Sequence, residues 1–166
     1  MRDRRIRMGE LVWVVLLLSL AADLLVAALL KSDVFRIGLL QSTPAASAGS
    51  LAIGAALLLV GCVLGYRSHE EFKRAISARG SIDHLINDGL YRHVRHPFYL
   101  SLIVISLSLA VLLRSSLLLA AWVVVAILLV VEARAEESGL VERFRQEYLD
   151  YQHRTGMFLP WLRRRG

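Results

Sequence analysis

The stretch FYLSLIVISLSLAVLLRSSLLLAAWVVVAILLVV, residues 98–131, decides the fold class. It consists of two apolar runs, 98–113 and 117–131, which are separated by the Arg-Ser-Ser sequence of residues 114–116. A helix of about 15 residues spans only ~23 Å, which is less than the ~30 Å of a bilayer core. The two runs therefore predict a tight hairpin of membrane helices that extend into their flanks, the second continuing through Glu132.

Two more apolar segments precede this hairpin, at residues 11–30 and at about 48–66. The first is longer than the h-region of a signal peptide, which has about 7–15 residues, and we interpret it as a retained helix. Hydrophobic residues make up 56% of the 166 residues, and the mean hydropathy is +0.54. Because this excess is concentrated in runs, the sequence predicts an all-α integral membrane bundle of about four transmembrane helices.

Lys and Arg are distributed unevenly around these apolar segments. With four spans, the N-terminal tail, residues 67–97 and residues 132–166 share one side of the membrane and carry most of the positive charge. Positive residues are enriched in cytoplasmic loops, so both termini are expected to be cytoplasmic, in a bacterial-type inner membrane. We expect a single membrane domain, 1–166, with two N-terminal helices (1–66), a cytoplasmic loop, the hairpin (98–131) and a cytoplasmic C-terminal segment.

The C-terminal segment has its own apolar pattern. Leu140, Phe144, Tyr148 and Tyr151 recur at intervals of three or four residues. On a helix this spacing forms an apolar stripe, which predicts an amphipathic helix on or near the membrane surface.

Several classes of function find no support in the sequence. The net charge of +6 does not indicate nucleic acid binding, because the arginines flank apolar runs. The single Cys62 excludes a disulfide or a cysteine zinc site within one chain, and His69-Glu70-Glu71 lacks the second His of a zinc protease motif. No metal is expected. Asp23 lies inside the first apolar segment, where a charge is costly, and is expected to face the bundle.

Two polar clusters, residues 83–99 and 132–162, share the predicted cytoplasmic face. Pro97 fits the first turn of a helix, so the third helix should begin there, with its positive dipole end beside His96. Simpler explanations remain open. Interfacial aromatic residues and arginines, Arg95 among them, often only anchor helices or set topology, and the acidic residues after the hairpin fit a solvated face.

The two clusters together resemble a known superfamily. GLYRHVRHPFYLS (89–101), followed after the hairpin by EARAEESGLVERFRQEYLDYQHRTGMFLP (132–160), is similar to the isoprenylcysteine carboxyl methyltransferase and phospholipid methyltransferase superfamily. Its pattern runs G-x-Y, R-H-P-x-Y-x-G, a helical hairpin, E-E-x-x-L, F-G-x-E-Y-x-x-Y and a final proline. The resemblance covers roughly residues 80–162. Members of the superfamily are integral membrane enzymes that use S-adenosylmethionine without a Rossmann fold.

The resemblance implies S-adenosylmethionine as the cofactor and also implies which residues contact it. They come from the H-P-x-Y block, the tyrosine before it, the glutamate pair and the stretch before G-x-Y. These residues are His96, Pro97, Phe98, Tyr99, Tyr91, Glu136, Glu137, Asp83, His84, Leu85 and Ile86. The chain departs from the pattern at Ser101 and Arg145, where the superfamily has glycines, and at Asp83, where it often has a histidine.

The acceptor side departs further. An arginine often stands four residues before the cofactor glutamate and serves the methyl acceptor, whereas this chain has Glu132 there and Arg134 two residues later. Both are candidate acceptor-side residues. A carboxylate at position 132 would repel an anionic acceptor and would favour an amine or a neutral one.

The sequence thus predicts S-adenosylmethionine-dependent methyl transfer to a lipid-like or small hydrophobic acceptor at the cytoplasmic membrane face. The expected partners are the lipid bilayer and that acceptor, and the choice between O-, N- and S-methylation is left open. One alternative is a non-catalytic membrane protein on the same scaffold that binds lipid or a partner. Another is a transport or sensor subunit built around Asp23.

Overall fold

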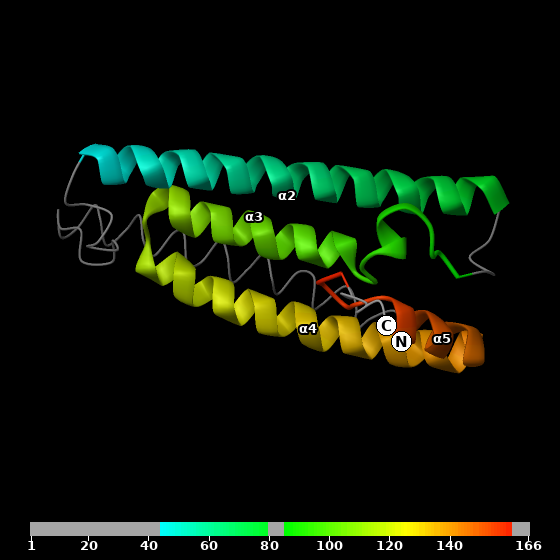
Figure 1. The fold of residues 1–166 in the computed structure, drawn as a ribbon. Helices are drawn as coiled ribbons and strands as arrows, with labels where there is room; N and C mark the ends of the chain where they lie inside the picture. Colours follow the sequence, from blue (N-terminus) through cyan, green and yellow to red (C-terminus); the bar gives the residue numbers. More distant parts are fainter. Residues whose placement is uncertain (1–43, 80–84, 161–166) are drawn as a thin grey trace, which may run out of the picture. The chain divides into compact units, whose positions relative to one another are not determined.

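The computed structural model describes residues 44–79 and 85–160, and this part of the chain is helical. Figure 1 shows its helices in chain order. They are α2 (Pro44–Arg79), the 3-10 helix η2 (Gly89–Arg92), α3 (Pro97–Leu113), α4 (Ser116–Phe144) and α5 (Gln146–Arg154). No β-strand occurs in the described residues, so the all-α prediction is confirmed for them. The helix predicted at 11–30, with Asp23, lies outside the described residues.

The turn between α3 and α4 closes where the sequence predicts it. Arg114 has a φ of 51°, and its N–H donates to the carbonyl of Val111 at 3.3 Å. The next N–H, of Ser115, donates to the carbonyl of Ala110 at 3.1 Å, which completes a Schellman motif. The Oγ of Ser115 then accepts the N–H of Leu118 at 3.1 Å and caps α4. The turn therefore satisfies free backbone groups at the end of α3 and at the start of α4.

Two of the described helices, α2 and α4, are long and apolar enough to cross a membrane, and α3 is a shorter apolar helix of 17 residues. The predicted start of α3 at Pro97 and the predicted continuation of α4 past Glu132 are confirmed. The four transmembrane helices of the prediction are therefore supported only in part.

Helix α2 continues beyond the apolar run that predicted it. The run ends near residue 66, but the helix reaches Arg79, so residues 67–79 of the expected loop are helical. This stretch contains neither Gly nor Pro and is rich in helix-forming Glu, Lys, Arg and Ala. Lys73 and Glu70 also form an ion pair along it at 3.4 Å. The first part of the expected loop, residues 67–79, is therefore a polar helix.

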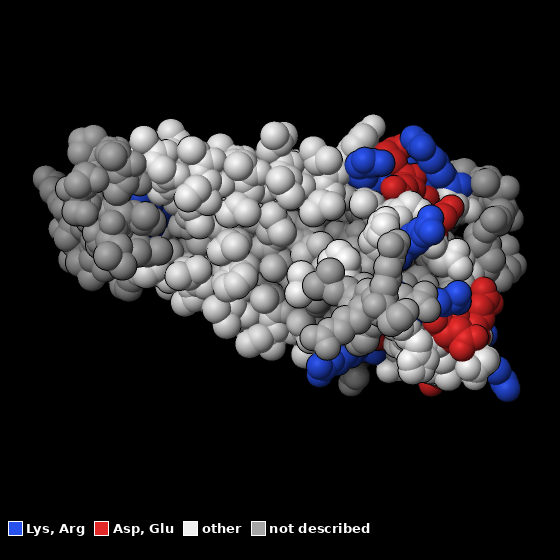
Figure 2. All heavy atoms as spheres, viewed as in Figure 1, with Lys and Arg blue, Asp and Glu red and all other residues white. Residues whose placement is uncertain are grey.

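The described residues form two compact units. The apolar unit comprises residues 44–61 and 103–132, and its only charged residues there are Arg114 and Glu132. The polar unit comprises 62–79, 85–102 and 133–160 and carries the other charged residues of the described part. Figure 2 shows Lys, Arg, Asp and Glu gathered over the polar unit, while the described surface of the apolar unit in view is almost uncharged.

The apolar unit has apolar side chains both inside and outside. In it α3 lies beside α4, where Trp122 Nε1 donates to the carbonyl of Ile103 at 3.0 Å, and beside α2, where Leu112 leaves no room for a Cβ on Gly54. One face of α4 is buried, at Leu118, Ala121, Val125 and Leu129. The other face exposes Val123, Val124, Ile127 and Val131. An apolar exterior of this kind suits a lipid environment.

The polar unit has a small aromatic core. Leu85, Tyr148 and Tyr151 are buried together, and Leu140, Val141 and Phe144 pack against them. The predicted apolar stripe from Leu140 to Tyr151 therefore faces this core. It is divided between the end of α4 and α5 by Arg145, whose φ of 48° and ψ of −121° interrupt the helix. The location of α5 at a membrane surface stays a prediction.

Candidate functional site

The polar unit brings together the two polar blocks that the sequence singled out. His96 and Tyr99 stand at the start of α3, and Glu136 and Glu137 stand on α4, about 40 residues later in the chain. Nδ1 of His96 lies 3.8 Å from Oε2 of Glu136, and Nε2 of His96 lies 3.1 Å from Oε1 of Glu137. One imidazole therefore contacts both carboxylates, which makes this cluster the candidate site.

Glu136 is the more accessible of the two carboxylates. Its side chain is 32% exposed, and Oε2 accepts a hydrogen bond of 3.1 Å from the hydroxyl of Tyr99. The Tyr99 ring in turn stacks on the ring of His96, with centroids 5.4 Å apart and planes within 2°. Glu136 thus presents a carboxylate beside two stacked rings. These rings lie at the N-terminal end of α3, which is the positive end of the helix dipole.

Glu137 is buried and accepts hydrogen bonds from three side chains. Oε1 accepts from Arg95 Nε at 2.7 Å and from His96 Nε2 at 3.1 Å, and Oε2 accepts from Gln152 Nε2 at 2.9 Å. A carboxylate can only accept, so the contact with Glu137 places a proton on Nε2 of His96. A buried charge is stable only when it is paired and hydrogen-bonded, and Glu137 meets both conditions.

Arg95 also holds the segment that follows α5. Its Nη1 donates to the carbonyl oxygens of Gln152 and Thr155. The backbone N–H of Arg95 donates to the carbonyl oxygen of Gly156 at 2.9 Å, and the N–H of His96 donates to the carbonyl oxygen of Met157 at 3.1 Å. Residues 94–96 and 155–157 therefore run side by side as a short parallel pairing around the bridge Val94–Gly156.

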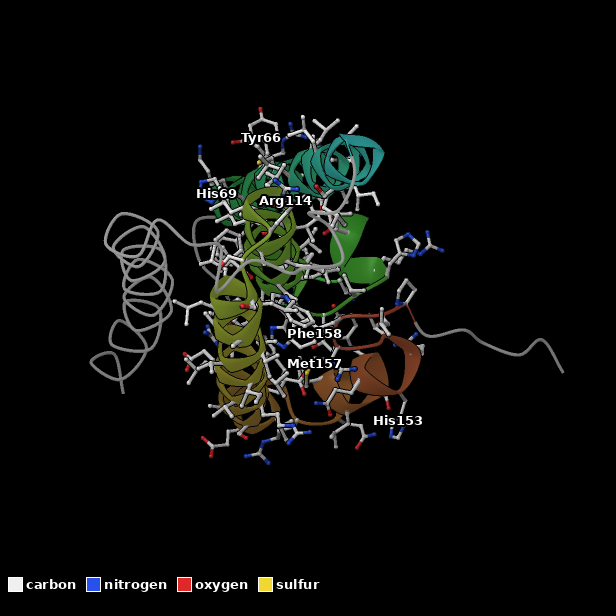
Figure 3. The ribbon with its side chains drawn as sticks, turned by 90° about the vertical axis from the view of Figure 1, so that its left-hand side faces the viewer. Tyr66, His69, Arg114, His153, Met157 and Phe158 are labelled. Atoms are coloured by element: carbon white, nitrogen blue, oxygen red, sulfur yellow. The ribbon has the colours of Figure 1, made fainter. Side chains whose placement is uncertain are left out.

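This pairing brings an aromatic side chain to the site. Phe158 follows the paired segment, and its ring lies 6.2 Å from that of His96 in a tilted arrangement. Figure 3 labels Phe158 and its neighbour Met157. The C-terminal segment thereby covers one side of His96 with apolar surface.

Tyr91 lies on η2, and a hydrogen bond to its backbone carbonyl holds it in place. Its carbonyl accepts the hydroxyl of Tyr151 at 2.6 Å. Burial, followed by the nearby carboxylates of Glu136 and Glu71, raises the pKa of the Tyr91 phenol to about 12. Burial likewise raises the pKa of Tyr151. Both phenols therefore stay protonated near neutral pH, so the Tyr91 hydroxyl can act as a hydrogen-bond donor.

The remaining residues of the predicted cofactor set are distributed as follows. Asp83 and His84 lie outside the described residues. Leu85 is buried in the aromatic core, and Ile86 beside it is half-buried. Pro97 is fully buried as the first residue of α3, whereas the Phe98 side chain is exposed. The role of each of these residues in cofactor binding stays a prediction.

The acceptor-side candidates are placed differently. Glu132 is half-buried and belongs to the apolar unit, while Arg134 is exposed and belongs to the polar unit. Within residues 44–79 and 85–160, no ion pair or side-chain hydrogen bond joins either of them to another side chain. The same ranges hold no group of three or more residues suited to bind a metal ion.

Three residues in or near the cluster are not identified by sequence reasoning. Arg95 fits a topology marker in the sequence, but its Nε is the closest hydrogen-bond donor to Glu137, at 2.7 Å. Gln152 lies in a run of polar residues with nothing to distinguish it. Glu71 belongs to the His-Glu-Glu triplet that was excluded as a zinc motif, and its Oε2 accepts the N–H of Leu90 at 2.7 Å. Only the position of Arg95 directly before His96-Pro97 could have indicated a role.

Comparison with known proteins gives two findings for this arrangement. A model of the isoprenylcysteine carboxyl methyltransferase (ICMT) family matches residues 51–142, which include His96, Tyr99 and the glutamate pair. Methanethiol S-methyltransferase 1 of Bradyrhizobium diazoefficiens is 40% identical over 74 residues, which are 45% of this chain and 25% of that protein. The chain thus spans about a quarter of the length of this curated relative. No solved structure matches.

Proposed function

Because the chain belongs to the isoprenylcysteine carboxyl methyltransferase family, we propose that it is a membrane methyltransferase. In this proposal the methyl donor is S-adenosylmethionine and the acceptor is a lipid-like or small hydrophobic molecule. The observation that carries the proposal is the contact of His96 and Tyr99 with the Glu136–Glu137 pair. It joins the two family blocks into one cluster, as a shared cofactor site requires.

The side chains of the cluster fit the chemical groups of the donor. Glu136 is a partly exposed carboxylate, which suits the ribose hydroxyls or the ammonium group of S-adenosylmethionine. The N-terminus of α3 at Pro97 suits its carboxylate, because the first N–H groups of a helix lack intrahelical partners. The rings of Tyr91 and Tyr99 suit the apolar parts and the sulfonium. When bound, S-adenosylmethionine supplies an electrophilic methyl group on a cationic sulfur.

Glu136 and Glu137 have different roles in this proposal. Glu137 is buried and accepts from Arg95, His96 and Gln152. We therefore assign Glu137 to holding the imidazole of His96 in place and Glu136 to contacting the donor. The division follows from accessibility, since a side chain 32% exposed can meet a ligand and one 10% exposed is occupied by its partners.

Methyl transfer is an in-line displacement, and the main task of the protein is to align donor and acceptor and to exclude water. The apolar ring of Phe158 against His96 contributes to water exclusion on one side. A water-soluble donor would reach the polar unit from the cytoplasm, while a hydrophobic acceptor would arrive through the bilayer that surrounds the apolar unit. This supports a site at the cytoplasmic face of the membrane.

The acceptor class is narrowed by two observations. The relative from Bradyrhizobium diazoefficiens is named for methyl transfer to methanethiol, which supports small thiols as candidates here. Glu132 stands where the superfamily often has an acceptor-binding arginine, which disfavours an anionic acceptor. We therefore include neutral thiols and amines in the proposed class and place carboxylate lipids last.

The test begins with donor binding to the detergent-solubilised full chain by titration calorimetry. Wild type should bind S-adenosylmethionine, and Glu136→Gln and His96→Ala should each weaken binding by about tenfold or more. Glu142→Gln is the matched control, because Glu142 is an exposed carboxylate on the same helix. Absence of donor binding by wild type would show that the proposal is wrong, and equal binding by all variants would show that the assigned residues are wrong.

The second step uses donor labelled on its methyl group and a panel of acceptors. An alkanethiol, a lipid amine and a prenylated cysteine with a free carboxylate represent the three chemical classes. Label should appear in the thiol or the amine. A wild-type protein that binds the donor but methylates nothing in the panel or in a membrane lipid extract would favour the non-catalytic alternative.

A further inference from the structure

We propose that Glu71, on the polar part of α2, is a positioning residue that fixes the start of η2 and thereby holds Tyr91, a residue of the proposed donor site, in place. The inference rests on the proposed function, because it concerns the geometry of the same donor site. It also gives a role to the His69-Glu70-Glu71 triplet. His69, labelled in Figure 3, is exposed on α2, and Glu70 accepts from Lys73 on the same helix, whereas Glu71 accepts from Leu90 on η2.

The contact itself is short and links distant parts of the chain. Oε2 of Glu71 accepts the backbone N–H of Leu90 at 2.7 Å, across a separation of 19 residues. Hydrogen bonds from a backbone N–H to a carboxylate are charge-assisted and about twice as strong as neutral ones. The bond is also partly buried, which shields it from competing water.

Glu71 supplies a cap that the local sequence does not provide. The first N–H groups of a helix have no partner within it, and an Asp at the N-cap normally accepts one of them. Asp88 is the N-cap residue of η2, but its side chain makes no capping hydrogen bond. The N–H of Leu90, the second residue of η2, donates to Glu71 instead. The carboxylate on α2 therefore performs the capping function from outside.

Gly89 leaves room for this contact because it has no side chain. Its φ is +54°, which favours glycine, and a Cβ built there would lie 2.5 Å from the carboxyl carbon of Glu71. Any larger residue would both strain the backbone and push the carboxylate away. The glycine of the G-x-Y motif is thus explained by the close approach of Glu71 as well as by its turn.

The cap also affects the position of Tyr91, the residue after Leu90. The backbone of η2 is held at its start by Glu71, and the carbonyl of Tyr91 is held by the hydroxyl of Tyr151. The side chain of Tyr91 is half-buried, and burial, followed by the charges of Glu136 and Glu71, raises the pKa of its phenol. Loss of the cap would release the start of η2 and leave Tyr91 held only by the hydrogen bond from Tyr151 to its carbonyl.

The neighbouring Glu70 provides a matched control. It has the same charge and lies on the same helix, but among the described residues it pairs with Lys73 at 3.4 Å, and the side chains of Glu70 and Lys73 are 30% and 59% exposed. A surface pair of this kind contributes little to stability. Glu70→Ala therefore removes the same charge from the same turn without touching η2.

The experiment compares wild type, Glu71→Ala, Glu71→Gln, Gly89→Ala and Glu70→Ala as full chains in detergent. Hydrogen exchange of the Leu90 amide, followed by mass spectrometry, reports the cap, and S-adenosylmethionine titration reports the site. We expect Glu71→Ala to accelerate exchange at Leu90 and to weaken donor binding by about tenfold. Glu71→Gln keeps an acceptor oxygen and should recover most of both losses, while Glu70→Ala should match wild type.

The outcomes separate this inference from the proposed function. If wild type does not bind the donor, the proposed function is wrong, and the exchange data alone then decide whether the cap exists. If wild type binds and Glu71→Ala binds equally well, the positioning role is overturned. Unchanged exchange at Leu90 in Glu71→Ala overturns the cap. If Glu71→Ala does not fold, Gly89→Ala displaces the carboxylate from the other side, and unaltered donor binding by that variant overturns the inference.

Discussion

Arg95 Nε and Glu137 Oε1 lie 2.7 Å apart, with their side chains 12% and 10% exposed, and this pair joins the start of α3 to α4 and to the segment after α5. One or the other of the two residues also contacts His96, Gln152 and Thr155. The pair therefore links the stability of the polar unit to the geometry of His96.

Removal of one partner should be costly. Glu137→Ala leaves the guanidinium of Arg95 buried without its carboxylate and should destabilise the protein by about 3 kcal/mol. The measurement is thermal unfolding in detergent. The exposed pair of Glu70 and Lys73 is the comparison, since Glu70→Ala should cost less than about 1 kcal/mol. Equal losses for the two variants would show that the Arg95–Glu137 pair has no special structural role.

The hydroxyl of Tyr99 allows a finer test of Glu136. Tyr99→Phe keeps the ring that stacks on His96 but removes the 3.1 Å hydrogen bond to Oε2 of Glu136. Donor binding should weaken by about three- to tenfold, because one hydrogen bond to a charged acceptor is lost and Glu136 becomes less well oriented. Tyr66→Phe is the control, since Tyr66 on α2 is 70% exposed. A matching loss in the control would indicate a nonspecific effect.

Tyr91 should make stability depend on pH in the alkaline range. The pKa of its phenol rises from 10.0 to about 12 because of burial and of the charges of Glu136 and Glu71. The folded state therefore binds the phenolic proton more tightly than the unfolded state does. This contribution is complete below pH ~10 and is lost as the pH rises from ~10 through ~12.

Thermal unfolding measured between pH 9 and about 11.5 checks this expectation. Tyr91→Phe has no proton to lose at this position, so its melting temperature should fall less steeply than that of wild type. Parallel curves for the two proteins would contradict the proposed environment of Tyr91.

The sequence predicted the elements with regular signals and failed where a contact is formed between distant segments. The hairpin at residues 114–116 and the start of α3 at Pro97 follow from local rules, because apolar runs, a proline and a capping serine act within a few residues. The extension of α2 to Arg79 was missed since membrane segments are recognised by hydropathy, and a polar helix that continues a span carries no such signal.

The candidate site likewise contains residues that the sequence identified and residues that it missed. The resemblance identified His96, Tyr99 and Glu136, which the structure brings together. It did not identify Arg95 and Gln152, whose role depends on Glu137, or Glu71, whose role depends on Leu90. Such roles arise from pairing across 15 or more residues, and a single sequence contains no record of which carboxylate meets which donor.

One departure from the family pattern is explained by packing. Ser101 replaces the glycine of R-H-P-x-Y-x-G, and it is buried with its Oγ 3.0 Å from the position of a Cβ on Gly65. Its hydroxyl donates to the carbonyl of Phe98 at 2.6 Å, so the polar group is satisfied within α3. A serine fits here because the facing residue of α2 is Gly65, which has no side chain.

Glu132 provides a test of acceptor choice. Glu132→Arg restores the residue that the superfamily often carries at this position, and it should shift methyl transfer from amine or neutral acceptors toward carboxylate acceptors. The physical reason is the reversal of local charge, which turns repulsion of an anion into attraction. The measurement is the ratio of kcat/KM values for a carboxylate lipid and a thiol, with Arg134→Glu as the opposite charge change nearby. An unchanged ratio would show that position 132 does not face the acceptor.

The second glycine departure predicts a gain in stability. Arg145 joins α4 to α5 with a φ of 48° and a ψ of −121°, a conformation that glycine adopts readily and that a side chain makes costly by about 1–3 kcal/mol. Arg145 is exposed, so its side chain has little packing to lose. Arg145→Gly should therefore raise stability by about 1 kcal/mol, after the entropy that glycine gains in the unfolded chain is subtracted. Thermal unfolding of the variant measures the gain. Arg143→Gly is the control with the same charge change: Arg143 lies in the last turn of α4 with its guanidinium over the ring of Phe144, and the change should lower stability by about 1 kcal/mol. A loss in both variants would show that the backbone at position 145 does not adopt this conformation.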